Sequence, residues 1–164
     1  MKSLLVSLIT VQVLAFSANA QLRISINIGT QPSWGPVGYD YVDYYYLPEA
    51  DMYYYVPDKV FIYRNGNSWR RSVTLPSRYH NIDLYRTHKV VINGVNRPYL
   101  NNSRYQREYN SYRNRYDQTP IRDSRDEKYF QNRQHPQHDQ WKRNNPGHGR
   151  RNDKGHQDHH GQRN

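Results

Sequence analysis

Six of the eight histidines lie within the last thirty residues of this 164-residue chain. Neutral imidazoles that are close in sequence can share a transition metal such as Zn²⁺, Ni²⁺ or Cu²⁺. The sequence has no cysteine, so a metal site here would lack a thiolate ligand and would bind weakly. A low-affinity metal site and a tail in which histidine merely aids solubility both fit this pattern. The candidate metal ligands are His135, His138, His156, His159 and His160.

Basic residues form a second group, because 24 lysines and arginines stand against 14 aspartates and glutamates, for a net charge of +10. After residue 100, arginines are interleaved with tyrosines, a mixture typical of surfaces that neutralise anions and stack on rings. We therefore expect contact with an anionic polymer or glycan. The candidate residues are Arg104, Arg107, Arg113, Arg115, Arg150 and Arg151.

Tyrosine is the third group, with 17 copies. The runs at 44–46 and 53–55 must send alternate rings to opposite faces of a sheet. Rings on an outer face could stack on sugars or peptides. The simpler interpretation is favoured, in which inner rings fill the core and outer rings are ordinary strand surface. The candidate aromatic surface consists of Trp34, Tyr44, Tyr46, Tyr53 and Tyr55.

Catalytic patterns are weak by comparison. His80 and Asp83 could approach Ser77, but no spacing links them as base, orienting group and nucleophile. The sequence has no P-loop, no G-x-S-x-G and no H-E-x-x-H. We expect a protein that is not an enzyme and has no dedicated cofactor.

The first twenty residues predict a secretory signal peptide. Lys2 precedes an apolar run at 4–16, and small residues follow at Ala18 and Ala20. The run is well short of the ~20 residues that cross a bilayer as a helix. Cleavage after Ala20 would release an exported chain, periplasmic or extracellular, with no transmembrane segment. Nucleic acid is an unexpected partner for such a chain.

The elements that would position these groups divide at residue 100. Apolar residues are far more frequent in 21–100 than in 101–164, so only the first part is expected to build a core. Alternating apolar residues and turn signals predict short strands. These strands lie at 22–28, 39–47, 52–56, 60–63, 68–73 and 89–93.

The pair Asn65-Gly66 predicts a type I′ hairpin between two of these strands. A two-residue loop would place Trp69 opposite Ile62, and a three-residue loop would place it opposite Tyr63. The expected fold is mainly β, a small antiparallel sheet closed as an open barrel or sandwich over residues 21–100.

A basic amphipathic helix is predicted in residues 101–117. Tyr105, Tyr109, Tyr112 and Tyr116 are spaced to share one face, and Ser103 with Gln106 has capping-box spacing. Residues 118–164, rich in His, Arg and Asn, are expected to be mostly disordered, because they offer little to bury.

The order of motifs also carries a resemblance. YYYLPEADMYYYVPDKVFIYRNGNSW is followed by LPSRYHNIDLYRTHKVVING and then by a charged tail. Over residues 34–100 the chain resembles a group of small, exported, Tyr-rich proteins of Gram-negative bacteria to which no activity is attached. The resemblance implies export and a compact β domain, and it implies no site.

Together these observations predict an exported, non-enzymatic binding protein of the cell envelope whose cationic tail contacts anionic polymers. One alternative is low-affinity transition-metal binding in the periplasm through the histidines. Another is structural self-association, in which Tyr-rich strands add to a partner's sheet edge.

Overall fold

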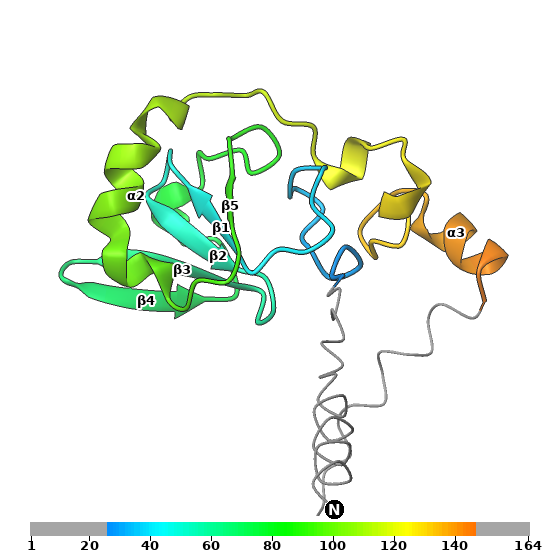
Figure 1. Cartoon of the computed structure of the whole chain (residues 1–164), viewed down its shortest axis with the longest axis horizontal. Coiled ribbons are helices and arrows are strands. Elements are labelled where there is room, and N and C mark those ends of the chain that lie inside the picture. Colours follow the sequence, from blue (N-terminus) through cyan, green and yellow to red (C-terminus); the bar gives the residue numbers. More distant parts are fainter. Residues whose placement is uncertain (1–25, 147–164) are drawn as a thin grey trace, which may run out of the picture.

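A computed structural model describes residues 26–146 (Figure 1). Its centre is one antiparallel sheet with the strand order β4-β3-β2-β1-β5. The strands are β1 (Tyr44–Leu47), β2 (Met52–Tyr55), β3 (Val60–Asn65), β4 (Ser68–Ser72) and β5 (Val90–Ile92). The predicted small, mainly β fold with an antiparallel sheet is confirmed.

Both faces of the sheet are covered, because alternate residues of β1, β2 and β3 enter two separate cores. On one face Tyr45, Tyr54 and Phe61 pack with Trp34 from the loop before β1. On the other face Tyr46 and Tyr53 pack beneath tyrosines that follow β5 in the chain. The central strands are therefore buried on both sides.

The helix α2 (Asn102–Glu108) covers the second face, and a 3-10 turn at Asn110–Tyr112 continues it. Tyr105, Tyr109 and Tyr112 pack against the sheet, as their predicted shared face requires. The helix stops well short of Tyr116, and Asn114 has a φ of +59°. Asn and Ser after residue 108 favour local turns over a continued helix. The predicted cap does not form, since Asn101 occupies the N-cap position without a side-chain bond.

The first predicted strand, at 22–28, is wrong for its described part, because residues 26–28 form a loop. The side chain of Asn27 replaces a neighbouring strand: its Nδ2 donates to Val42 O at 2.7 Å, and its Oδ1 accepts from Val42 N at 3.0 Å. Ile28 is buried with Ile121 and Tyr129. Residues 21–25 lie outside the described part.

The predicted hairpin forms, but both predicted registers are wrong. Trp69 lies opposite Arg64, and Asn65 pairs with Ser68, so the loop residues are Gly66 and Asn67. Only Gly66 of these two has positive φ, at +59°. One positive φ at the first loop position is the requirement of a type II′ turn, whereas type I′ needs two.

Ordered structure extends further along the chain than predicted. The disorder expected from residue 118 does not hold for residues 118–146, which form 3-10 turns at Ile121–Asp123 and Glu127–Tyr129 and the helix α3 (His138–Asn144). In Figure 1 the loop before β1, in blue, lies beside this segment, in yellow and orange.

Side-chain amides hold this segment in place where apolar content is low. Asn132 is fully buried and donates to Ile28 O at 2.8 Å and to Gln31 O at 2.7 Å. Backbone bonds join Ile121 N to Gly35 O at 2.7 Å. Residues 147–164 lie outside the described part. In the part described, no helix is both long and apolar enough to cross a membrane.

Candidate functional site

The predicted aromatic surface is not a surface. Trp34 is only 8% exposed, Tyr44, Tyr46 and Tyr53 are buried as well, and Tyr55 is half-buried. The interpretation of these rings as core is correct for all but Tyr55. The physical reason is that the sheet has two covered faces, so alternation of strand side chains exposes neither set.

A polar network explains how the hydroxyl groups of Tyr46 and Tyr53 tolerate burial. Asp51 accepts hydrogen bonds from Tyr46 Oη at 3.1 Å, from Asn102 Nδ2 at 3.0 Å and from Gln106 Nε2 at 2.7 Å. Tyr53 Oη donates to Asn102 Oδ1 at 2.7 Å. Burial raises the pKa of both phenols well above the usual value. This network joins the β1–β2 turn to α2, and its role is structural.

The predicted metal ligands within the described chain do not converge. His135 is buried, with Nδ1 accepting from Gln137 N at 3.0 Å and Nε2 at 3.1 Å from Ser124 O. His138 Nδ1 lies 3.0 Å from Phe130 O. Within residues 26–146 there is no group of three or more His, Cys, Asp or Glu side chains placed to hold a metal. His156, His159 and His160 lie outside the described residues.

The four predicted arginines within the described residues are exposed, and the ion pairs of Arg104 and Arg115 are with nearby residues of the same segment. Arg104 lies 3.4 Å from Glu108 across one helical turn. Arg115 forms an ion pair with Asp117 and lies over the ring of Tyr112, at 4.6 Å. Arg107 and Arg113 are exposed. Arg150 and Arg151 lie outside the described residues.

A different cationic surface, which the sequence reasoning missed, is formed by the β3–β4 hairpin and the 3-10 turn Ser77–Tyr79. Four exposed arginines lie here beside half-buried rings on both faces of the hairpin, and we call these residues together the arginine–aromatic edge. Arg64 and Arg71 lie on the face of Trp69, whereas Arg70 and Arg78 lie on the face of Tyr63 and Tyr79. Its residues are Arg64, Arg70, Arg71, Arg78, Tyr63, Trp69 and Tyr79.

Two guanidinium groups of this edge lie over the faces of its rings. Arg64 Cζ is 5.6 Å from the centre of Trp69, and Arg78 Cζ is 4.6 Å from that of Tyr79 and 5.1 Å from that of Tyr63. Among the described residues, only Arg71 of the four arginines forms an ion pair, with Asp58 at 2.5 Å. The edge therefore carries positive charge that residues 26–146 leave largely uncompensated.

The hairpin also provides one of the two open sides of the sheet. β4 and β5 are its edge strands, and in the described part of the chain no further strand pairs with either. The Tyr-rich strands β1 and β2 are central, each paired on both sides. In the described chain these two strands therefore offer no free edge to which a partner's strand could add.

Next to the arginine–aromatic edge lies a groove of about 760 Å³. Its apolar walls come from Trp34, Tyr54 and Phe61 of the first core, and from Leu75, Leu84 and Tyr85 of the loop between β4 and β5. Lys59 and Arg133 also line it, and both are exposed. No local pattern in the sequence indicates this groove, because residues 29–34 and 132–134 meet only in the folded chain.

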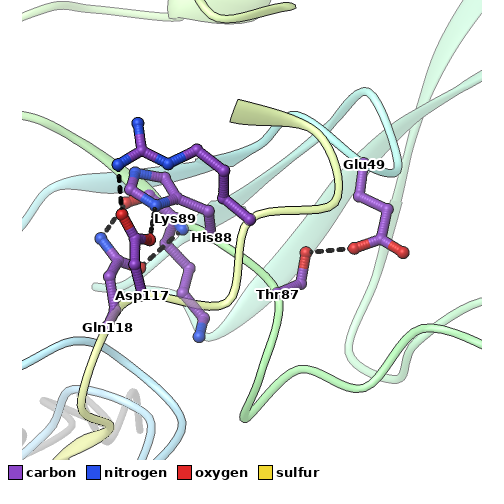
Figure 2. Close-up of polar contacts among 7 residues, drawn as sticks. Glu49, Thr87, His88, Lys89, Asp117 and Gln118 are labelled. Carbon is purple, nitrogen blue, oxygen red and sulfur yellow. Dashed lines mark hydrogen bonds and ion pairs between the residues drawn. The ribbon is translucent and has the colours of Figure 1, made fainter. Parts of the chain in front are cut away.

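Directly before β5 in the chain, residues 87–89 make the polar contacts that Figure 2 shows. Thr87 Oγ1 donates to Glu49 at 2.6 Å, and His88 Nδ1 lies 2.6 Å from Asp117. The hydrogen bond from His88 lowers the pKa of the Asp117 carboxyl. An aspartate that orients a histidine is half of a catalytic arrangement, but the described contacts of His88 include no nucleophile. His80 contacts the backbone of Ser77 and not Asp83.

The same figure shows the Lys89 amine away from these contacts. Lys89 is 1% exposed, and its Nζ has no hydrogen-bond partner in the described chain. Burial lowers the pKa of this amine to about 8. The side-chain amide of Gln118 forms two hydrogen bonds with the Lys89 backbone: Oε1 accepts from Lys89 N at 2.8 Å, and Nε2 donates to Lys89 O at 2.9 Å.

Comparison of the chain with protein-family models, with curated proteins and with solved structures gives no match. A function for this protein is therefore inferred from the geometry of the arginine–aromatic edge and of the groove.

Proposed function

We propose that this protein is exported and binds anionic polymers of the cell envelope without catalysing a reaction. The arginine–aromatic edge makes the main contact. This keeps the class of partner expected from the sequence and moves the contact from the tail to the hairpin. The signal-like first twenty residues support export, and the excess of basic residues supports an anionic partner.

The observation that carries the proposal is the uncompensated charge of the edge. Arg64, Arg70 and Arg78 are exposed and have no ion pair within residues 26–146, and two of them lie over aromatic rings. A ring holds the guanidinium in place, so less side-chain entropy is lost when an anion binds. Sulfate, phosphate and carboxylate groups all fit such a fork of donors.

The test compares two double variants with the same loss of charge. Arg64→Gln with Arg70→Gln alters the edge, and Arg104→Gln with Arg107→Gln alters the exposed side of α2. On a dextran sulfate matrix we expect the edge variant to elute at clearly lower salt than the α2 variant. Equal elution of the two variants would show that net charge alone decides retention and would overturn the proposal.

A further inference from the structure

We infer that the groove beside the arginine–aromatic edge binds a short acidic oligosaccharide of the uronate class. Its sugar rings would lie against the apolar walls, and its carboxylates would meet Lys59 and Arg133. The inference rests on the proposed function and deepens it, because it assigns the ligand class of a second, enclosed contact.

The charge of the groove favours an anion. Its lining contains two cations and no aspartate or glutamate. Within residues 26–146, neither Lys59 nor Arg133 forms an ion pair, although the described chain forms such pairs elsewhere. Two exposed, unpaired cations on one hollow are complementary to a ligand with more than one negative group.

The walls favour a ring over a bare inorganic anion. Trp34, Tyr54 and Phe61 are buried against one another, with the Trp34 and Tyr54 ring centres 4.8 Å apart, and form the floor of the groove. Leu75, Leu84 and Tyr85 add half-buried carbon surface. Phosphate or sulfate alone would leave this surface wet, whereas the C–H face of a sugar ring covers it.

Polar groups in the groove suit hydroxyl oxygens. Gln134 Oε1 accepts from Ser33 N at 3.0 Å, while its NH₂ group forms no hydrogen bond with the rest of the described chain. Thr74, also in the lining, is exposed. A volume of about 760 Å³ lies within the range of pockets that enclose ligands of a few rings.

The test titrates the full chain with trigalacturonate, using its methyl ester and maltotriose as neutral ligands of similar shape. Calorimetry is expected to show saturable binding of trigalacturonate and at least tenfold weaker binding of both neutral ligands. Lys59→Gln with Arg133→Gln is expected to weaken trigalacturonate binding at least tenfold. The matched pair Lys142→Gln with Arg143→Gln, on α3, should change it less than twofold.

A steric variant separates the groove from general charge. Thr74→Trp places a bulky ring at an exposed lining position and is expected to weaken trigalacturonate binding at least fivefold without altering retention on dextran sulfate. No saturable binding at millimolar trigalacturonate would overturn the inference, as would equal binding of the ester or an unaffected Lys59/Arg133 variant. Tighter binding of a nucleotide would also overturn it. Each result leaves the elution comparison of the edge variants as the separate test of the proposed function.

Discussion

Lys89 has a buried amine whose desolvation is not offset by a hydrogen bond in the described chain. Its pKa near 8 means that the unfolded chain binds the proton more tightly than the folded chain, because an ordinary lysine titrates near 10.5. The contribution of Lys89 to the free energy of unfolding therefore becomes more favourable as pH increases from 8 to 10.5. The cost of the buried amine is greatest at neutral pH and below.

Lys89→Met is accordingly expected to stabilise the protein at pH 7 by about 2 kcal/mol, since it removes a buried unpaired polar group. The advantage over the unaltered chain should shrink between pH 8 and 9.5. Urea denaturation at several pH values measures both effects, with Lys142→Met as the exposed control. A constant difference across this range would contradict the lowered pKa.

Lys59 combines a cation on the groove with a strained backbone. Its φ is +55°, and its N–H bonds to Val56 O at 3.2 Å in the turn before β3. Lys59→Gly is expected to raise the free energy of unfolding by about 1 kcal/mol, because glycine adopts this conformation without a Cβ clash. Thermal unfolding of Lys59→Ala is the control. An equal gain with alanine would mean that strain is not the cause.

At the scale of elements, α2 is attached to the sheet by its tyrosines and by the carboxylate of Asp51. Asp51→Asn keeps the side-chain shape but replaces an acceptor oxygen by a donor facing Tyr46, Asn102 or Gln106. We expect a loss of about 2 kcal/mol in urea denaturation. Asp58→Asn, which affects only an exposed ion pair, should cost less than ~0.5 kcal/mol.

Five of the six predicted strands and the shared tyrosine face could be predicted, because each leaves a local periodic pattern in the sequence. β2, β3 and the face formed by Tyr105, Tyr109 and Tyr112 match the apolar pattern closely. The register of the hairpin could not be predicted, because Asn65-Gly66 permits more than one loop. The observed register places Trp69 against Tyr53, a contact that local sequence does not indicate.

The contacts away from the arginine–aromatic edge could not be predicted from local sequence patterns. The His88–Asp117 pair spans 29 residues, and the Asn132 bonds to Ile28 and Gln31 span more than a hundred. A side-chain amide that bonds to a distant backbone, as Asn132 does, leaves no periodic pattern in the sequence. The expectation of disorder from residue 118 failed for this reason, because it counted apolar residues and not such bonds.

For the molecule as a whole, Asn132 determines whether residues 118–146 remain part of the domain. Asn132→Ala leaves two buried carbonyl oxygens without their donor and is expected to cost about 2 kcal/mol. Trypsin should then cut faster at Arg125 and Lys128. Asn144→Ala, at the exposed end of α3, is the control and should leave the cleavage rate unchanged.

The position of the tyrosine runs within the sheet has a consequence for concentrated solutions. Segments such as YYYL and MYYY have the high β-propensity and low charge of sequences that stack into cross-β fibrils. Here they are inner strands, and the edge strand β4 presents Arg70 and Arg71 to any chain that approaches on that side. Repulsion between like charges then opposes edge-to-edge addition of a second copy at β4. The same arginines that would attract an envelope polymer thus guard this edge of the sheet against stacking.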